Sequence, residues 1–219
     1  AKFCNIKTTI FHSHTTNIDN KKLFHYLTRF LMKLLAKHRF ACSEEAGKFM
    51  FGDSKFSVIP NGIDINKFSY SGVKRKKLRN ELNIPEDSFV IGHVGRFTYA
   101  KNHPYIMKIF EKIYDSLGNN VYLLLVGDGV DKEKIINENI NKKFFKNVII
   151  LSNRNDVNDL LSCMDIFIFP SYYEGLPVSL VEAQAANLPI IISENISNFV
   201  IIDNSLIKKL KIDDNCIFE

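Results

Sequence analysis

The chain has 219 residues, with 29 Lys and Arg against 24 Asp and Glu, a net charge of +5, and a hydrophobic fraction of 46%. This composition excludes a disordered chain and predicts a globular protein with an ample hydrophobic core. The cations are spread along the chain, which argues against a dedicated nucleic-acid surface and leaves phosphorylated small molecules or an anionic membrane surface as partners.

Short apolar runs alternate with amphipathic segments of helical period almost from end to end, which is typical of βα units and a parallel sheet in an α/β fold. The expected strands are 8–11, 39–42, 57–59, 90–94, 122–126, 148–151, 166–169 and 189–192. The expected helices are 20–37, 43–51, 73–82, 104–117, 132–142, 157–163 and 177–186. Beyond Ser193 the pattern loses its period and predicts no closing helix.

The pattern is interrupted at Pro60, Asn61 and Gly62, and a polar stretch follows before the next strand, so we expect a domain boundary there. The prediction is a partial N-terminal lobe at 1–68 and a larger C-terminal lobe at 69–219. The chain begins without Met or a signal-peptide pattern, which predicts a fragment cut from a longer protein. No apolar run approaches the ~18 residues that span a bilayer. Four widely spaced cysteines fit a reducing cytoplasm better than a disulfide framework.

Two acidic residues flank the start of one predicted helix. Glu174 stands in the loop before it, and Glu182 lies inside the helix, roughly 7 to 8 Å from its first residue at a rise of about 1.5 Å per residue. The free N–H groups of Gly175, Leu176 and Val178, with the helix dipole, predict an anion site between the two acids. The alternative is that both are ordinary surface acids.

The loop after the strand 90–94 contains Gly95, Arg96 and Lys101. Its two cations could hold a diphosphate by charge-assisted hydrogen bonds, unless they are merely solvated. No Asp-x-Asp occurs anywhere in the sequence, so a divalent ion that bridges a diphosphate has no obvious ligands, and the cations and the helix N-terminus would replace it. The Gly127-Asp128-Gly129 run predicts a tight turn rather than a phosphate loop.

Two histidines, His12 and His14, follow the strand 8–11 and share one face of an extended segment. No cysteine or carboxylate nearby completes a metal-ligand set, so we expect no metal and interpret His12 as a single ligand-facing histidine.

The predicted helix 20–37 has apolar residues at three- and four-residue spacing, cations elsewhere, and no acid between Asp19 and Glu44. Such a helix either lies on a membrane surface or packs on its own sheet with a solvated basic face.

The motifs together resemble a known family. Glu174 and Glu182 form an E-x7-E motif within Pro-Ser-Tyr-Tyr-Glu-Gly-Leu-Pro-Val-Ser-Leu-Val-Glu-Ala-Gln-Ala-Ala at 170–186. The other motifs, in chain order, are Phe-His-Ser-His-Thr-Thr at 11–16, Ala-Cys-Ser-Glu-Glu-Ala-Gly-Lys at 41–48, Pro-Asn-Gly-Ile-Asp at 60–64, Gly-His-Val-Gly-Arg-Phe at 92–97 and Lys-Asn-His at 101–103. This set resembles the group 1 glycosyltransferases, that is, glycosyltransferase family 4, and within it the capsular and exopolysaccharide branch.

The resemblance implies a GT-B architecture of two Rossmann-like lobes, here a C-terminal lobe plus part of a second lobe. It also implies sugar transfer with retention of configuration, without an essential metal or other cofactor. The donor would be a nucleotide sugar, here a UDP-linked hexose, and the acceptor a growing polysaccharide or lipid-linked saccharide. The enzyme would work in the cytoplasm, with peripheral contact at the inner face of the membrane.

The resemblance also implies a role for each site residue. Arg96 and Lys101, beside Gly95, would hold the diphosphate, and Glu182 would bind the ribose hydroxyls. Glu174 would contact the hexose, with His12 near the same sugar. The remaining donor contacts would come from backbone N–H groups at Gly175 and Leu176 and, for the base, from Asn153 and Arg154.

The family's full chain begins before Ala1 and continues beyond Glu219, so the resemblance implies truncation at both ends and an incomplete acceptor lobe. Two alternatives stay open. One is a donor-binding fragment without catalysis, and the other is a nucleotide-sugar epimerase on the same architecture.

Overall fold

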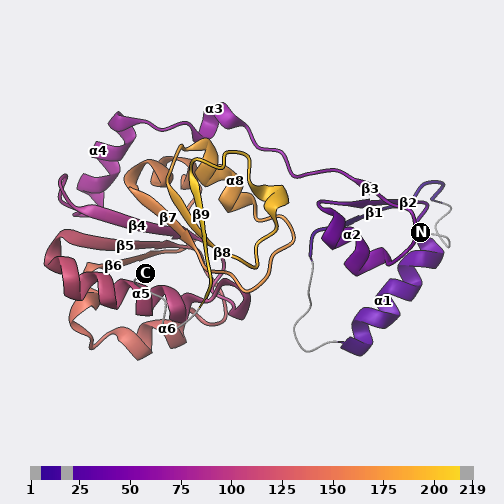
Figure 1. Ribbon diagram of the computed structural model, residues 1–219, viewed down its shortest axis with the longest axis horizontal. Helices are drawn as coiled ribbons and strands as arrows, with labels where there is room; N and C mark the ends of the chain where they lie inside the picture. The colour runs from indigo at the N-terminus through magenta and orange to yellow at the C-terminus, as the bar shows by residue number, and fades with distance from the viewer. Residues whose placement is uncertain (1–5, 16–21, 213–219) are drawn as a thin grey trace. The chain divides into compact units, whose positions relative to one another are not determined.

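The computed structural model describes residues 6–15 and 22–212 (Figure 1). Contacts divide the chain into two compact units, Ala1–Gly62 with Tyr173–Val178, and Ile63–Tyr172 with Ser179–Glu219. Within the described ranges, no helix is long and apolar enough to cross a membrane. The lobe boundary expected between residues 68 and 69 stays a prediction.

The first unit contains a parallel sheet in the order β1-β2-β3. Its elements are β1 (Ile10–Ser13), α1 (Lys22–Leu35), β2 (His38–Ala41), α2 (Glu44–Phe51) and β3 (Ser57–Val58). Helix α2 begins directly after Ser43, whose hydroxyl accepts a hydrogen bond from the Ala46 amide at 3.1 Å, as an N-cap should. Strand β1 lies two residues later than predicted, so His12 stands inside the strand rather than after it.

The second unit contains a six-stranded parallel sheet in the order β6-β5-β4-β7-β8-β9. Its strands are β4 (Phe89–Val94), β5 (Val121–Val126), β6 (Val148–Leu151), β7 (Ile166–Phe169), β8 (Ile190–Ser193) and β9 (Ile207–Leu210). Its α-helices are α3 (Ile65–Phe68), α4 (Gly72–Glu81), α5 (His103–Leu117), α6 (Lys132–Asn139), α7 (Val157–Leu160) and α8 (Val178–Ala185). Short 3-10 helices lie at Tyr99–Lys101, Gly118–Asn120, Lys143–Asn147, Leu161–Cys163 and Asn198–Val200.

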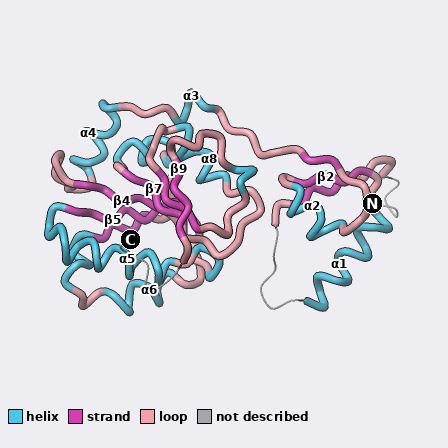
Figure 2. Tube along the Cα trace, viewed as in Figure 1, coloured by secondary structure: helices cyan, strands magenta, loops and turns pink. Residues whose placement is uncertain are grey.

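Helices cover both faces of this sheet, with α5 and α6 on one side and α4 and α8 on the other (Figure 1). The strands alternate with loops and helices along the chain (Figure 2). On the α5 side, Ile106, Phe110 and Tyr114 pack against Leu123 and Leu125 of β5 in one buried cluster. Strands that are apolar on both faces need this double cover, so the expected α/β parallel sheet is confirmed.

One strand and one α-helix of the described chain were not predicted from the sequence, apart from the short 3-10 helices. Strand β9 reads Ile-Lys-Lys-Leu and pairs with β8 at the edge of the sheet. Its two lysines interrupt the apolar run that marked the buried strands. Helix α3 is a single turn that begins after Asp64, whose carboxylate accepts a hydrogen bond from the Asn66 amide at 3.2 Å.

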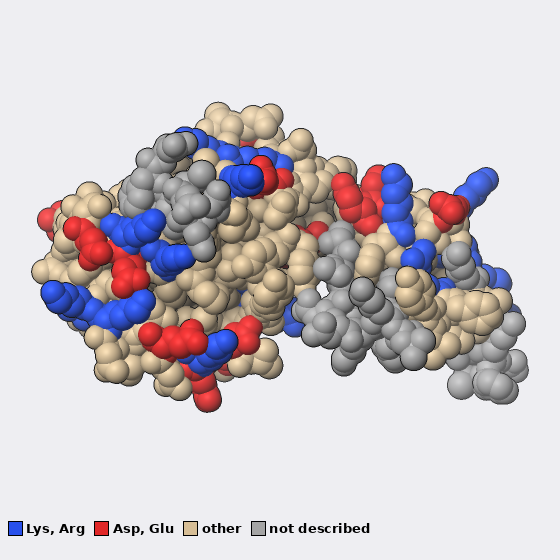
Figure 3. Space-filling view, turned by 60° about the horizontal axis from the view of Figure 1, so that its bottom comes forward, with Lys and Arg blue, Asp and Glu red and all other residues tan. Residues whose placement is uncertain are grey.

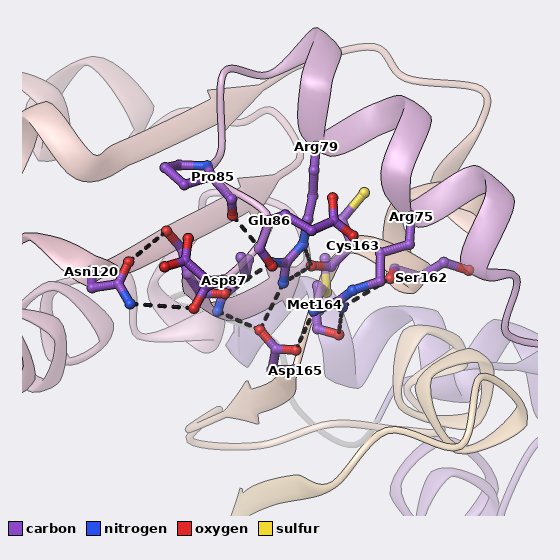
Figure 4. Close-up of polar contacts among 12 residues, drawn as sticks. Arg75, Arg79, Pro85, Glu86, Asp87, Asn120, Ser162, Cys163, Met164 and Asp165 are labelled. Carbon is purple, nitrogen blue, oxygen red and sulfur yellow. Dashed lines mark hydrogen bonds and ion pairs between the residues drawn. The ribbon is translucent and has the colours of Figure 1, made fainter.

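A buried guanidinium fixes α4 to the sheet at the amino ends of β4 and β7 (Figure 4). Arg79 is 0% exposed and donates to the carbonyls of Cys163 (2.9 Å), Glu86 (2.8 Å) and Ser88 (2.8 Å). It also forms an ion pair of 2.8 Å with Asp165. The other Asp165 oxygen accepts from Arg75 at 2.6 Å. A buried charge needs such complete pairing, so this cluster holds the helix in one place.

Candidate functional site

The order of the strands marks one edge of the second unit as a binding site. The chain runs outward from β4 through β5 to β6 and then returns to β7 on the other side of β4. In open α/β sheets, ligands bind outside the carboxyl ends of the strands where the order reverses. Here that place lies beyond Val94 and Phe169, the last residues of β4 and β7.

The loops beyond β4, β5 and β6 are joined by backbone hydrogen bonds. The Gly95 amide donates to Val126 at 3.0 Å, the Gly127 amide to Leu151 at 2.8 Å, and the Phe97 amide to the carbonyl of Asp128 at 2.9 Å. Gly127 has a φ of 153°, and a Cβ there would lie 2.0 Å from the Gly95 oxygen. The loops can therefore approach this closely only with glycine at 127.

The two predicted cations occupy different environments in this edge. Arg96 is exposed and makes no hydrogen bond or ion pair with another residue of the described chain. Lys101 is half-buried, and its Nζ lies 4.4 Å from the centroid of the Phe169 ring. A Cβ at Gly95 would lie 3.2 Å from the Lys101 stem, so this glycine leaves room for it. The loop thus presents one solvated cation and one cation held over an aromatic ring.

Two buried histidines support this loop, a feature that the sequence did not reveal. The Nδ1 of His93 lies 2.9 Å from the Ile168 carbonyl, which can only accept, so Nδ1 carries the proton. The His103 ring stacks on Phe97 at 3.9 Å and meets His93 edge-on at 5.0 Å. Both residues lie within the motifs at 92–97 and 101–103, but no pattern in the sequence predicts that their rings are buried together.

Burial keeps both rings neutral near pH 7. It lowers the pKa of His93 well below its usual value, and a proton on the neighbouring His103 would act in the same direction. Burial, with the nearby Lys101 ammonium, lowers the pKa of His103 to about 4. Because both rings are neutral, the positive charge of this loop lies on Arg96 and Lys101.

The loop after β6 carries the residues expected near a base. Arg154 forms a bidentate ion pair with Asp156, with Nε–Oδ1 and Nη2–Oδ2 distances of 2.7 and 2.5 Å. The hydrogen bonds from Arg154 lower the pKa of Asp156. Asn153 is exposed with a φ of 54°. The guanidinium therefore already has a partner, and contact of these residues with a base stays a prediction.

Glu182 lies on α8, the helix that follows β7, and its side chain is half-buried. Burial raises the pKa of its carboxyl group, and Lys67 partly offsets this. A carboxylate that is only partly solvated gains from hydroxyl donors, as a pair of ribose hydroxyls would supply.

The remaining predicted residues belong to the first unit. His12 is exposed on β1, with its ring 4.2 Å from that of His14. Burial, with the neighbouring His12, lowers the pKa of His14. No group of three or more His, Cys, Asp or Glu side chains suited to a metal occurs among the residues the structure covers.

The loop that carries Glu174 also groups with the first unit. Glu174 is half-buried. A Cβ at Gly175 would lie 2.3 Å from the His14 oxygen, so glycine is required for this approach. The Leu176 carbonyl accepts from the Asn61 side chain at 3.4 Å. Helix α8 begins at Val178, one residue later than predicted, so Pro177 precedes the helix instead of lying in its first turn.

Comparison with known proteins identifies the family. The model of the family "Glycosyl transferases group 1" matches residues 74–215. The chain belongs to the group 1 glycosyltransferases. Among curated relatives of this family, the putative glycosyltransferase EpsF of Bacillus subtilis is 33% identical over 98% of this chain and 58% of its own length.

One further relative and one solved structure extend the comparison. A UDP-Gal:alpha-D-GlcNAc-diphosphoundecaprenol alpha-1,3-galactosyltransferase of Escherichia coli is 33% identical over 68% of the chain and 39% of its own length. The crystal structure of Anabaena Alr3699/HepE in complex with UDP and glucose has a TM-score of 0.80 at 20% identity, over 96% of the chain and 59% of that protein. The expected fold of Rossmann-like GT-B lobes is thereby confirmed. The chain spans about 58% of the length of its EpsF relative.

Proposed function

We propose that this group 1 glycosyltransferase is a retaining enzyme that transfers a hexose from a UDP-linked donor to a growing cell-surface polysaccharide or a lipid-linked saccharide. One observation carries the proposal. Arg96 and Lys101 lie in the loop beyond β4, and Glu182 lies on the helix after β7, the two strands where the sheet order reverses. Two similar proteins support this substrate class. One is the galactosyltransferase whose name gives UDP-Gal and a diphosphoundecaprenol-linked sugar, and the other is HepE, whose structure was solved with UDP and glucose.

Each residue has a distinct part in this proposal. Arg96 and Lys101 neutralise the diphosphate, whose charge grows as the sugar–phosphate bond breaks, so their attraction is greatest in the transition state. Glu182 binds the ribose hydroxyls and fixes the donor along α8. Glu174 and His12 act on the hexose, Gly175 and Leu176 offer backbone N–H groups, and Asn153 and Arg154 lie near the base.

The proposal includes metal-independent binding, because Arg96 and Lys101 could neutralise the diphosphate in place of a bridging metal ion. It also places the enzyme in the cytoplasm, at the inner face of the membrane, where a lipid-linked acceptor of capsule or exopolysaccharide synthesis is available.

Product analysis with UDP-hexoses and an undecaprenyl-diphosphate saccharide tests the proposal. A transferase releases UDP only when the acceptor is present, and NMR of the product then shows an anomeric configuration equal to that of the donor. A new UDP-hexose isomer would instead indicate an epimerase, and tight UDP binding without turnover a binding module. Inversion at the anomeric carbon would refute the retaining mechanism alone.

A chelator tests whether donor binding depends on a metal ion, independently of the reaction that the enzyme catalyses. Calorimetry with UDP should give the same affinity with and without EDTA. Loss of binding in EDTA with recovery in magnesium would contradict the metal-independent site.

A further inference from the structure

A hollow of about 210 Å³ lies beside the loop that carries Lys101. Its lining comes from the segment between β4 and α5, from the first turns of α5 and α6, and from Tyr172 beyond β7. All of these residues belong to the second unit. Arg96, Lys101 and Glu182 do not line the hollow. The hollow is therefore built from a different set of side chains than the donor site proposed above.

Two tyrosines form an aromatic wall on this hollow. The rings of Tyr99 and Tyr172 stack with their centroids 4.9 Å apart and their planes at 24°. The Tyr172 amide donates to the Ala100 carbonyl at 2.9 Å, which joins the loops that carry the two rings. Tyr99 is nevertheless 66% exposed. An exposed ring offers a flat apolar face with partial negative charge, on which the C–H groups of a sugar ring can pack.

Polar side chains without a partner complete the lining. Thr98 precedes the 3-10 helix at Tyr99–Lys101 and Asp131 precedes α6, so both occupy N-cap positions. Neither side chain accepts a hydrogen bond from the helix that follows it. Asp131 has φ −91° and ψ −3°, which is helical backbone rather than the extended backbone of a capping residue. The half-buried carboxylate of Asp131 and the hydroxyl of Thr98 are therefore available to a ligand.

The charges around the hollow are balanced. Asp131 and Lys134 are its one acid and its one base, and the buried His103 is neutral near pH 7. Lys134 also lies 3.9 Å from Glu138, in an exposed i,i+4 pair that contributes little and that a ligand can replace. Over the drawn face of the second unit, Lys and Arg are interspersed among Asp and Glu (Figure 3). A lining without excess positive charge favours a neutral polar ligand over a phosphate.

We propose that this hollow binds one sugar unit of a neutral saccharide. One face of the ring would stack on Tyr99, while its hydroxyls would donate to the Asp131 carboxylate and accept from the Lys134 ammonium. The volume is below the roughly 300 to 1,000 Å³ of pockets for drug-sized ligands and suits a single ring. This site goes beyond the proposed function, because its ligand needs neither UDP nor transfer of a hexose.

Fluorescence tests the site directly. The chain has no Trp, so Tyr99→Trp introduces a single one on the aromatic wall and keeps an aromatic ring there. The probes are methyl α-glucoside, methyl α-galactoside and N-acetylglucosamine at millimolar concentration. At least one of them should change the Trp emission saturably. No saturable response to any of the three sugars would overturn the proposal, whether or not uridine or inorganic phosphate binds instead.

Paired variants in calorimetry, with the sugar that responds, identify the lining. Asp131→Asn and Tyr99→Ala should each weaken sugar binding about tenfold, whereas Tyr99→Phe keeps the ring and should bind as the wild type does. The matched controls are Asp115→Asn and Tyr70→Ala, which change exposed residues outside the hollow and should alter binding less than about twofold. Circular dichroism confirms that each variant is folded. Equal losses in variants and controls, or in Tyr99→Phe and Tyr99→Ala, would overturn the assignment.

A comparison with UDP separates this site from the donor site. Asp131→Asn should keep the UDP affinity of the wild type, and Lys101→Ala should keep its sugar affinity. Displacement of the bound sugar by UDP would place that sugar in the donor site and would overturn a separate saccharide site. Failure of the chain to bind UDP, with the sugar still bound, would contradict the proposed donor and leave the saccharide site standing.

Discussion

Replacing Arg79 by Met should destabilise the second unit by about 3 to 5 kcal/mol, the usual cost of breaking a buried ion pair from one side. The substitution preserves most of the side-chain volume, so the loss reports the polar contacts. It removes the 2.8 Å ion pair with Asp165 and leaves the carbonyls of Cys163, Glu86 and Ser88 without their donor. A single unpaired buried acceptor costs about 1 to 3 kcal/mol, so several of them account for a value at this level.

The matched control is Lys77→Met, which removes a cation from the same helix. Lys77 is 74% exposed and lies 3.8 Å from Glu81 at i,i+4, so its loss should cost no more than about 0.5 kcal/mol. Urea unfolding followed by circular dichroism, with the slope of the transition unchanged, measures both. Amide exchange at Val90, which donates to Asp165 at 2.7 Å, should also accelerate in Arg79→Met. Equal stability of Arg79→Met and Lys77→Met would refute this reasoning.

The remaining predictions concern the site. Lys101→Ala should weaken UDP binding by about 1.5 to 3 kcal/mol, the range of a charged hydrogen bond, and spare uridine, whereas the exposed Lys143→Ala should change neither affinity in calorimetry. In an active enzyme, Glu182→Gln should raise KM for the donor and weaken UDP binding, while Glu174→Gln and His12→Ala should lower kcat and spare UDP affinity; the reverse pattern would contradict the proposed placement of the donor. Stability should fall as pH is lowered from about 6.5 towards 4, because the unfolded chain gains a proton at His103 that the folded chain excludes. His103→Phe should remove about 3 kcal/mol of this pH dependence, and the exposed His38→Phe should leave it in place.

The parallel sheets followed from the sequence because strands buried on both faces are recognisable as short apolar runs. The sequence predicts the ranges 148–151 and 166–169 correctly, since β6 and β7 consist wholly of Ile, Val, Leu and Phe. Strand β9 was not predicted, because an edge strand tolerates lysine and its sequence therefore lacks a continuous apolar run. The spacing between Glu174 and Glu182 is visible in the sequence, and it predicts Glu182 as a site residue.

Other parts of the site depend on contacts between distant residues. No local pattern predicts that Lys101 lies over Phe169, 68 positions along the chain, or that the His93 ring lies against the Ile168 carbonyl. The pairing of Arg79 with Asp165 is of the same kind, since the sheet order brings them together across 86 residues. Sequence pattern indicates which residues are buried, but their partners are set by the topology.

The lysines of β9 have a consequence for how the chain behaves in solution. Among the described residues, β9 is the last strand of its sheet, and the free side of an edge strand is a template on which another chain can form an intermolecular sheet. Lys208 is exposed, and the Lys209 ammonium donates to the Ile196 carbonyl of its own chain. A second strand that paired there would have to accommodate two positive charges away from water. The same residues that obscured the strand in the sequence therefore protect the protein against aggregation at that edge.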